Sequence, residues 1–464
     1  MSSCKSEMKN VIEMSESEFN NSIQSGSLKI CVIGIGRIGL PTALSFANSG
    51  LSTIGLDINS ELVNMVNRGE FPLQDEPGYP TIFEKVLKEK KFSATTKIED
   101  AVPNSDVIVL SLPTPMDKQN VPNYDALRSV AKQLHEFLPI GAIVIVESTI
   151  EPGFIENELK FIIEGKNHKL IAGKNFGIGV CPETANPGQI LNDFEKLPRL
   201  VGAIDDKTKE MITKIYRHVF TVDLIPMPNC KTANAVKLTT NVFRDLNIAF
   251  INELAILFEK LGIDVMTVLD AAKTKYNFQV HYPGPGVGGP CLPVNSYQYL
   301  NTAKEIGLSL KLVETAREVN ESMPIHVVKL LSDAFDEQNK SLKESTILLL
   351  GVSYKPDVKD IQISPAEKII EKLKELNTNI RIYDPYFVSE NIFGIDTESN
   401  LIDALSISDG VILVTPHKEF HDIEPKFLKS KLRNPIFIDT RCILDQQEAI
   451  NAGLIYRGLG RGKL

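Results

Sequence analysis

A cysteine near the end of a segment rich in glycine and proline is a candidate for covalent chemistry. The segment His281–Pro293 holds four glycines and four prolines in thirteen residues, and it includes Cys291. This composition indicates a rigid loop whose backbone approaches another group closely. Pro293 suits the first turn of a helix over 295–305, and a thiol at a helix N-terminus has a lowered pKa and is a better nucleophile. Burial as a small apolar side chain explains Cys291 equally well.

Three of the polar residues in a long, largely apolar segment that we expect to be a helix could do chemistry. Residues 232–261 contain no glycine or proline, and an element this apolar is normally buried between two lobes or two subunits. Lys237 and Asn241 are four residues apart and therefore share a face, and Arg244 lies on the same stripe. A cation and an amide donor could stabilise an oxyanion. A polar stripe in solvent or at an interface explains the same residues.

Two further polar residues follow apolar runs that we expect to be parallel strands. Thr149 follows the run Ile143–Val146, and Glu183 follows Phe176–Val180. Ligands bind at the carboxyl ends of strands in an open α/β sheet. At this edge of the sheet, Thr149 could orient a water molecule or the substrate. Glu183 could act on that water or substrate. The alternative for each is a turn residue or a helix cap.

A glycine fingerprint predicts a dinucleotide site near the N-terminus. Gly34, Gly36 and Gly39 match G-x-G-x-x-G after the apolar run Leu28–Ile33, and Asp57 ends the next expected strand, 18 residues beyond Gly39. The glycines provide a tight turn, close approach to a pyrophosphate and close helix–strand packing. Asp57 would accept hydrogen bonds from a ribose and repel a 2′-phosphate, which favours NAD over NADP. The alternative is a glycine turn in a fold that binds something else.

Strands and helices that alternate along the chain must position these residues. One α/β block lies before the long helix and a second begins near Ser345, so we predict an α/β protein with two doubly wound Rossmann-like domains joined by a long central helix. Besides the runs named above, the predicted strands are Ser52–Leu56, Val107–Leu112, Thr346–Leu350, Asn379–Tyr383, Val411–Val414 and Ile436–Ile438.

Composition excludes several classes of function. The 464 residues carry a net charge of −9 with a pI near 5.5, which argues against a nucleic-acid or anionic-membrane surface. No apolar run is long enough to span a membrane, and residues 1–27 lack the apolar region of a secretory signal. None of the six cysteines forms a C-x-x-C pair, so we expect no metal site and a reducing cytoplasm.

The chain resembles the UDP-glucose/UDP-N-acetylmannosamine dehydrogenase family from about Leu28 to its C-terminus. The family's G-x-G-x-G-G-x-C loop matches residues 284–291, which end in the nucleophile. Other matching segments follow in the family's order: Gly34–Pro41, Glu76–Gly78, Pro113–Pro115, Glu147–Thr149, Cys181–Glu183, Lys237–Asn241 with Phe243 and Arg244, Ala316 and Arg317 with Asn320, and Gly351–Asp357.

The resemblance implies a domain layout and a set of partners. An N-terminal extension (1–27) would precede an NAD-binding domain (28–215), a central helical dimerisation domain with the cysteine loop (216–325) and a UDP-binding α/β domain (326–464). The expected partners are a UDP-sugar, NAD and a second copy of the chain. No nucleic acid or membrane is expected.

The resemblance also implies residue roles. Cys291 would capture a sugar aldehyde, Lys237 and Asn241 would stabilise oxyanions, and Glu183 would be the general base of thioester hydrolysis. Arg441 would reach the substrate of a neighbouring subunit. The expected cofactor contacts are Gly34, Gly36, Arg37, Ile38, Gly39, Asp57, Thr114 and Thr149. The expected substrate contacts are Lys237, Arg244, Tyr282, Gly288, Lys355 and Arg441, and Asn295 belongs to the expected catalytic set.

Three positions depart from the family pattern. Asn295 replaces an aspartate four residues after the nucleophile and cannot act as a base, so hydrolysis would depend on Glu183 alone or be slow. Thr184 and Gln362 replace arginines that are common in the family. Pro187-Gly188 and the form of the glycine loop resemble the N-acetylhexosamine enzymes, so we expect UDP-N-acetylmannosamine, with UDP-N-acetylglucosamine or UDP-glucose as alternatives.

Two other classes of function fit parts of the sequence. A two-electron hydroxyacid or 6-phosphogluconate-type dehydrogenase also has an NAD domain and a helix lysine, but needs neither the cysteine nor the second α/β block. It would yield one NADH per substrate. A non-catalytic nucleotide-binding protein would bind NAD and UDP-sugar without turnover.

Overall fold

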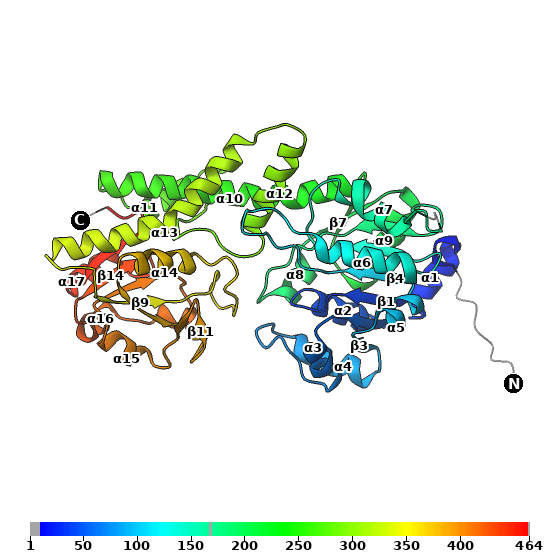
Figure 1. Cartoon of the computed structure of the whole chain (residues 1–464), viewed down its shortest axis with the longest axis horizontal. Helices are drawn as coiled ribbons and strands as arrows, with labels where there is room; N and C mark the ends of the chain where they lie inside the picture. The colour runs from blue at the N-terminus through cyan, green and yellow to red at the C-terminus, as the bar shows by residue number, and fades with distance from the viewer. Residues whose placement is uncertain (1–9, 167–168, 463–464) are drawn as a thin grey trace. The chain divides into compact units, whose positions relative to one another are not determined.

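The computed structural model describes residues 10–166 and 169–462, which belong to two compact units, 1–239 and 240–464. Each unit is built around a sheet of mainly parallel strands with helices on its faces (Figure 1). The predicted long helix is present as α10 (Cys230–Leu261), and the boundary between the units falls within it.

The first unit contains an eight-stranded sheet in the order β3-β2-β1-β4-β5-β6-β7-β8. All neighbours are parallel except β6 and β7. The order reverses beside β1, because β2 and β4 flank it, and the carboxyl edge at this switch point is where a doubly wound fold binds ligands. The strands are β1 (Lys29–Ile33), β2 (Ser52–Leu56), β3 (Phe92–Thr95), β4 (Val107–Leu110), β5 (Ile143–Val146), β6 (Gly177–Val180), β7 (Arg199–Ala203) and β8 (Leu224–Pro226).

Alternate residues of the central strands enter two separate cores. Val107 and Val109 of β4 pack with helices on one face, whereas Ile108 and Leu110 pack on the other. Both faces are covered, so the strands are continuously apolar. The helices of this unit are η1 (Val11–Glu13), α1 (Glu16–Gln24), α2 (Gly39–Asn48), α3 (Ser60–Asn67), α4 (Tyr79–Lys88), α5 (Ile98–Ala101), η2 (Val102–Asn104), α6 (Asp125–Phe137), η3 (Ile155–Leu159), α7 (Lys160–Glu164), α8 (Ile190–Lys196) and α9 (Asp206–Val219).

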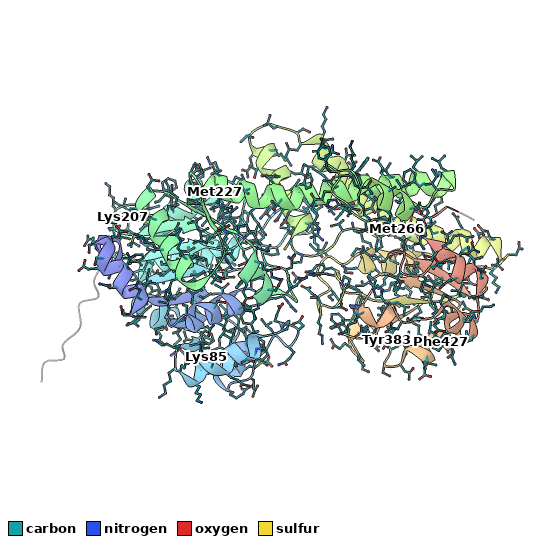
Figure 2. The ribbon with its side chains drawn as sticks, turned by 180° about the vertical axis from the view of Figure 1, so that it is seen from behind. Lys85, Lys207, Met227, Met266, Tyr383 and Phe427 are labelled. Atoms are coloured by element: carbon teal, nitrogen blue, oxygen red, sulfur yellow. The ribbon has the colours of Figure 1, made fainter. Side chains whose placement is uncertain are left out.

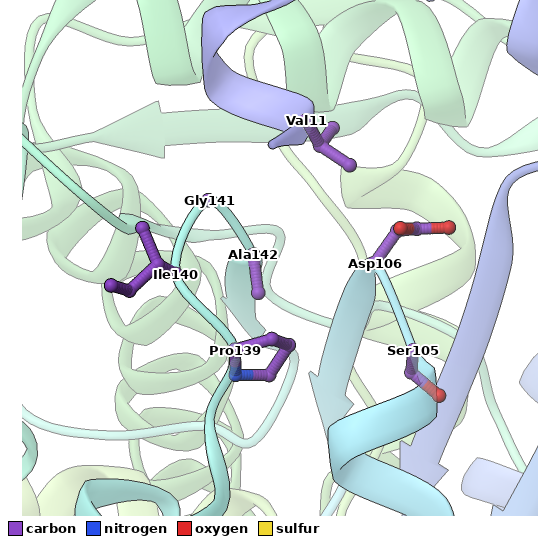
Figure 3. Close-up of a pocket in the computed structure, with 7 residues that line it drawn as sticks. All are labelled: Val11, Ser105, Asp106, Pro139, Ile140, Gly141 and Ala142. Atoms are coloured by element: carbon purple, nitrogen blue, oxygen red, sulfur yellow. The ribbon is translucent and has the colours of Figure 1, made fainter. Parts of the chain in front are cut away.

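The described part of the N-terminal extension packs at the amino ends of the strands. Ser15 caps α1 through a capping box, and Phe19 and Ile23 on the helix are buried in the core. The Ile12 N–H donates to the carbonyl of Gly141, which lies just before β5. Val11, Asp106 and Gly141 are among the residues that line a cavity of about 20 Å³, which has room for about one water molecule. Figure 3 shows these lining residues. The extension therefore packs at the edge opposite the glycine fingerprint. Residues 1–9, with Cys4, lie outside the described residues.

The second unit contains a five-stranded parallel sheet in the order β10-β9-β13-β14-β15, with its switch point between β9 and β13. Tyr383 and Phe427, labelled in Figure 2, pack against one of its two cores. The strands are β9 (Thr346–Leu350), β10 (Asn379–Tyr383), β13 (Gly410–Leu413), β14 (Ile436–Asp439) and β15 (Ile455–Gly458), with a hairpin of β11 (Asn391–Ile392) and β12 (Ile395–Asp396). The helices that follow α10 are α11 (Val265–Ala272), α12 (Leu292–Glu305), α13 (Lys311–Glu337), α14 (Pro365–Glu375), α15 (Leu401–Ser406), η4 (Lys418–Phe420), α16 (Pro425–Lys431) and α17 (Gln446–Asn451).

The predicted fold class is confirmed, since two α/β units with parallel sheets are present. The sequence did not predict β3, β7, β8, β11, β12 or β15. Strand β7 was missed because it begins with Arg199, which is 1% exposed, and an arginine signals a surface rather than a core. The predicted extents of the domains stay a prediction.

Candidate active site

The glycine fingerprint forms a cradle at the switch point of the first sheet. Gly34 has φ +88°, and a Cβ there would lie 2.4 Å from the carbonyl oxygen of Ser111. A Cβ on Gly39, where α2 begins, would lie 1.7 Å from the carbonyl oxygen of Gly34. A Cβ on Gly36 would meet nothing within 4 Å. Gly34 and Gly39 are thus fixed by packing, while the space beside Gly36 fits the approach of a dinucleotide phosphate to the α2 N-terminus.

Asp57 ends β2 and holds the glycine loop. Its Oδ2 accepts the Ile35 N–H at 3.0 Å, and its Oδ1 accepts the Asn59 N–H at 2.9 Å. Each oxygen keeps a second lone pair, so the carboxylate can also accept hydrogen bonds from a ribose.

The Arg37 side chain pairs with two carboxylates of its own unit. Its guanidinium lies 2.8 Å from Asp75 Oδ2 and 3.3 Å from Glu76 Oε1. The buried Glu76 also accepts the Gly188 N–H at 2.6 Å. The neighbour Ile38 packs against the core. Arg37 therefore helps to fix the loop that follows Glu183.

Three predicted residues of the first unit meet at the carboxyl edge of its sheet. Thr114 Oγ1 donates to the carbonyl of Thr149 at 2.9 Å, and the Glu183 N–H donates to the carbonyl of Glu147. Thr114, Thr149 and Glu183 follow β4, β5 and β6, which are neighbours in the sheet. The structure therefore places all three residues at the carboxyl edge, and their roles toward cofactor and substrate stay predictions.

Glu183 is held firmly by its surroundings. Its Oε1 accepts the N–H groups of Thr184 and Ala185, each at 2.6 Å, and its Oε2 lies 3.1 Å from Nη2 of Arg199. The side chain is 8% exposed. A carboxylate with these donors is fixed in one orientation.

Cys291 in the second unit is the N-cap of α12, and its side chain is exposed. The glycines before it pack without room for side chains. A Cβ on Gly288 would lie 2.4 Å from the carbonyl oxygen of Ile363, and one on Gly289 would lie 2.6 Å from the ring of Tyr354. The Gly289 N–H donates to the carbonyl of Gln362. The cysteine loop is therefore seated on residues 354–363, the segment that carries Lys355.

A buried amide chain ties the start of this loop to the helices behind it. Asn252 on α10 accepts the Gly284 N–H at Oδ1, 2.9 Å away, and donates from Nδ2 to Asn320 Oδ1 at 2.9 Å. Asn320 on α13 donates to Asp245 Oδ1 at 2.8 Å. All three polar side chains are at most 1% exposed.

The same aspartate holds the other side of the cysteine. Asp245 Oδ2 accepts the hydroxyl of Ser296, on the first turns of α12, at 2.7 Å. Arg317 Nη1 donates to both oxygens of Asp245, at 2.9 and 3.1 Å. One buried carboxylate therefore anchors segments before and after Cys291.

The side-chain amide of Asn295 is hydrogen-bonded at both ends within the second unit. Its Oδ1 accepts from Asn241 Nδ2 at 2.5 Å, and its Nδ2 donates to Gln298 Oε1 at 2.9 Å. Both ends of the amide are used, and Asn295 is 2% exposed. The contact brings two predicted residues together, Asn241 on α10 and Asn295 on α12. Lys237 is buried, whereas Arg244 is exposed.

The loop with Lys355 lies at the carboxyl edge of the second sheet and is held by a buried pair. Asp384 Oδ2 accepts the Val352 N–H at 2.7 Å and lies 3.0 Å from His417 Nε2. His417 Nδ1 accepts the Asp357 N–H, so the ring carries its proton on Nε2 and donates it to Asp384. Although burial opposes the charged form, these donors hold the pKa of Asp384 below its usual range.

The remaining predicted substrate residues lie on or near the cysteine loop. Tyr282 is 49% exposed. The guanidinium of Arg441 packs against Gly284 of its own chain, where a Cβ would lie 2.4 Å from Nη1, and its Nε donates to the Val414 carbonyl. Burial lowers the pKa of Arg441 to about 10, so it stays cationic at neutral pH. Its role toward a neighbouring subunit stays a prediction.

Sequence reasoning missed four buried polar residues that position the predicted ones: Glu147, Arg199, Asp245 and Asn252. Glu147 belongs to a segment that matches the family, but the match gave this residue no function. Asp245 and Asn252 gave none, because a polar residue in an apolar helix looks the same whether it faces solvent or a buried partner.

The chain matches three consecutive models of one family, described as the UDP-glucose/GDP-mannose dehydrogenase family: its NAD binding domain at residues 28–220, its central domain at 231–322 and its UDP binding domain at 348–446. The chain belongs to the UDP-glucose/GDP-mannose dehydrogenase family.

Relatives resemble nearly the whole chain. A UDP-N-acetyl-D-mannosamine dehydrogenase from Pyrococcus horikoshii is 34% identical over 435 residues, which cover 94% of this chain and 100% of that protein. A solved structure of the enzyme from that organism has a TM-score of 0.87 at 33% identity and covers 94% of this chain and 100% of its own. An NDP-N-acetyl-D-galactosaminuronic acid dehydrogenase from Methanosarcina mazei has a TM-score of 0.82 at 30% identity and covers 95% of this chain and 98% of its own.

These matches confirm the resemblance inferred from the sequence, NAD as the cofactor and the class of NAD-dependent nucleotide-sugar dehydrogenase. They do not favour the two-electron hydroxyacid dehydrogenase or the non-catalytic protein. The roles of individual residues stay predictions. Within residues 10–166 and 169–462, no helix combines the length and the apolar character needed to cross a bilayer.

Proposed function

We propose that this protein oxidises the primary alcohol of UDP-N-acetylmannosamine to a carboxylate, with two NAD consumed per sugar and Cys291 as the nucleophile. The observation that carries the proposal is the exposed thiol of Cys291 at the N-terminus of α12, on a loop seated against the segment of Lys355. A thiol in this position is more easily ionised, and the thiolate is the reactive form.

The cysteine makes the second oxidation possible. In the first step the alcohol loses a proton and a hydride and becomes an aldehyde. The thiolate of Cys291 then adds to the aldehyde carbon and gives a thiohemiacetal, from which a second hydride leaves. The resulting thioester is cleaved by water, which releases the carboxylate and the thiol. NAD, when bound at the glycine cradle, accepts the hydride in each oxidation.

Other predicted residues act on the charges that these steps create. Lys237 and Asn241 stabilise the oxyanion of the thiohemiacetal. Glu183 takes a proton from the attacking water, and Thr149 orients that water or the substrate. Asn295 supports Asn241 by its short hydrogen bond and is not a base. Lys355 at the switch point of the second sheet binds the diphosphate by charge.

A screen of UDP-sugars with NADH counting tests the proposal. We expect UDP-N-acetylmannosamine to give two NADH per sugar, ahead of UDP-N-acetylglucosamine, UDP-N-acetylgalactosamine and UDP-glucose. Support for this sugar comes from the relatives named for it. Cys291→Ser should stop carboxylate formation. Carboxylate produced at the wild-type rate by Cys291→Ser would refute the covalent route, and preference for UDP-glucose would refute the assignment of the sugar.

The functional form we propose is a homodimer formed through α10. Phe243, Phe250 and Leu257 repeat every seven residues on this helix and are 47%, 51% and 47% exposed. Apolar residues at this spacing on a long helix are typical of a helix that packs against a second one. Light scattering should show a dimer for the wild type and a monomer for Phe250→Glu. Leu312→Glu, at an apolar residue 77% exposed on α13, is the control and should stay dimeric.

We place the enzyme in the cytoplasm. None of the five described cysteines forms a disulfide with another of them, and a reducing compartment keeps cysteines in this state. Fractionation of cells that express the native protein tests this placement.

A further inference from the structure

The turn that carries Arg441 is shaped by one buried side chain. Asp439 ends β14 and is fully buried. Its Oδ1 accepts the N–H of Arg441 at 3.1 Å, and its Oδ2 accepts the N–H of Leu444 at 3.0 Å. Both donors lie in the turn that follows the strand, so Asp439 fixes the backbone from which the Arg441 side chain projects.

Arg461 braces the same turn from the C-terminal part of the chain. Its Nη1 donates to the carbonyl of Leu444 at 2.7 Å and to the hydroxyl of Tyr456 at 3.0 Å. That hydroxyl in turn donates to Asp439 Oδ2 at 3.1 Å. A planar guanidinium holds its donors in a fixed geometry, so it can bridge two acceptors without losing either. Arg461 and Asp439 are therefore joined through a buried tyrosine.

The residues around Arg461, 459–462, form a segment that packs along this turn. The N–H of Leu459 donates to the carbonyl of Asp439 at 3.0 Å, and the carbonyl of Leu459 accepts the thiol of Cys442 at 3.3 Å. Gln446 on α17 donates from Nε2 to the carbonyl of Gly462 at 2.9 Å. The segment 459–462 thus contacts the turn at its start, in its middle and at its end.

The same segment is also fixed to the end of α10 and the start of α11. Gly460 donates its N–H to Glu259 Oε1 at 2.8 Å, and its carbonyl accepts the N–H of Val265 at 2.9 Å. Gly460 has φ +75°, and a Cβ there would lie 2.6 Å from Cγ1 of Val265, so the fit depends on a glycine. The segment 459–462 therefore connects α10 to the turn of Arg441.

We propose that Arg461 is a positioning residue for the UDP-sugar, which acts through Tyr456 to hold Arg441 in the conformation that binds the substrate. The inference rests on the proposed function and on the predicted contact of Arg441 with its substrate. Without Arg461 the turn loses the bond to the Leu444 carbonyl and the brace on Asp439, so Arg441 samples other positions. Substrate binding then weakens, while the NAD cradle in the first unit keeps its shape.

The attachment to α10 matters because of the proposed dimer. That dimer forms through α10, and Arg441 is predicted to reach the substrate of a neighbouring subunit. A side chain that acts across an interface has to be fixed relative to the helix that forms the interface. The segment 459–462 provides this fixed reference, since it contacts both Glu259 of α10 and the turn of Arg441.

Steady-state kinetics of Arg461→Ala test the proposal. We expect the KM for UDP-N-acetylmannosamine, or for whichever UDP-sugar the screen prefers, to rise at least about tenfold, because one hydrogen bond to a charged group contributes about that factor to binding. The KM for NAD should stay at the wild-type value. Tyr456→Phe keeps the buried ring and removes the hydroxyl between Arg461 and Asp439, so it should raise the same KM by a smaller factor. If circular dichroism shows that Arg461→Ala is unfolded, Tyr456→Phe decides.

A double-mutant cycle with Arg441→Ala separates positioning from a general structural effect. If Arg461 acts through Arg441, then Arg461→Ala should raise the KM for the UDP-sugar by less than about twofold once the Arg441 side chain is gone. Two independent effects would instead multiply, to about a hundredfold in the double variant.

Arg457→Ala is the matched control. Arg457 lies on β15, its Nη1 donates to the carbonyl of Tyr456, and its Nη2 pairs with Glu337 on α13. This variant should keep the wild-type KM for the UDP-sugar.

Three results would overturn the inference while the proposed function, reported by two NADH per sugar, stood. Arg461→Ala and Tyr456→Phe could match Arg457→Ala, the effects in the cycle could multiply, or Arg441→Ala could leave the KM for the UDP-sugar unchanged. Absence of NADH with every UDP-sugar would overturn both the inference and the proposed function.

Discussion

Truncation of Asn252 to alanine should loosen the cysteine loop and destabilise the second unit. The substitution removes the acceptor of the Gly284 N–H and the donor to Asn320 Oδ1, both 2.9 Å contacts in the buried interior. Each buried polar group left without a partner costs about 1–3 kcal/mol. The free energy of unfolding should therefore fall by about 2–6 kcal/mol. In a unit of this size that corresponds to a Tm lower by roughly 5–20 °C.

Two assays separate loss of stability from loss of positioning. Urea unfolding gives the change in free energy, and the rate of alkylation of Cys291, followed by mass spectrometry of its peptide, reports the order of the loop. We expect alkylation of Cys291 to change in rate in Asn252→Ala at temperatures where the protein is still folded. Peptides with the buried Cys31 and Cys181 provide internal references.

Asn301→Ala is the control for this prediction. Asn301 lies on α12, and its Nδ2 donates to the carbonyl of Tyr297 on the same helix. The variant should unfold and react much like the wild type. If Asn252→Ala matched Asn301→Ala in both unfolding midpoint and alkylation rate, the amide chain would not be what holds the loop.

Three further predictions concern the first unit. Gly36→Ala should fold normally, because its Cβ meets nothing within 4 Å, and yet bind NAD at least about tenfold more weakly in calorimetry, whereas Gly39→Ala should fail to fold. A normal NAD affinity in Gly36→Ala would contradict the cradle. Burial raises the pKa of Glu147 from 4.5 to about 7, so its folded form keeps a proton that the unfolded chain loses, and stability should fall as pH rises through this window. Urea midpoints at about pH 5 and about pH 8 should therefore differ less in Glu147→Gln than in the wild type; an equal difference would show that another group is responsible. Phe19→Ala in α1, at a side chain 2% exposed, should lower the free energy of unfolding by about 3–5 kcal/mol without changing the KM for NAD, and a raised KM would mean that the extension reaches the cofactor edge.

The parts of the fold that sequence predicted are those set by local pattern. The runs Val107–Leu110 and Ile143–Val146 are apolar at every position because both sheet faces are covered, and such runs are visible without a structure. The glycine fingerprint is likewise local, since Gly34, Gly36 and Asp57 lie in adjoining strand–turn elements. Resemblance to the family extended this reading to Cys291 and Glu183.

The positioning residues could not be predicted, because their partners lie far away in sequence. Arg199 pairs with Glu147, 52 positions earlier, and Asn252 with Asn320, 68 positions later. A single sequence contains no record of which buried polar groups meet. The helical periodicity of the sequence gives the face of α10 on which Asn252 lies. It does not give the groups with which Asn252 forms hydrogen bonds.

The seating of the glycine loop constrains how the enzyme can be re-engineered. Gly288 and Gly289 touch the Ile363 carbonyl and the Tyr354 ring so closely that neither segment can change shape alone. A chimera that borrows residues 351–365 from a relative to obtain a new sugar preference should therefore borrow residues 284–291 as well. Exchanging one without the other would displace the reactive sulfur even if every residue that touches the sugar were transferred correctly.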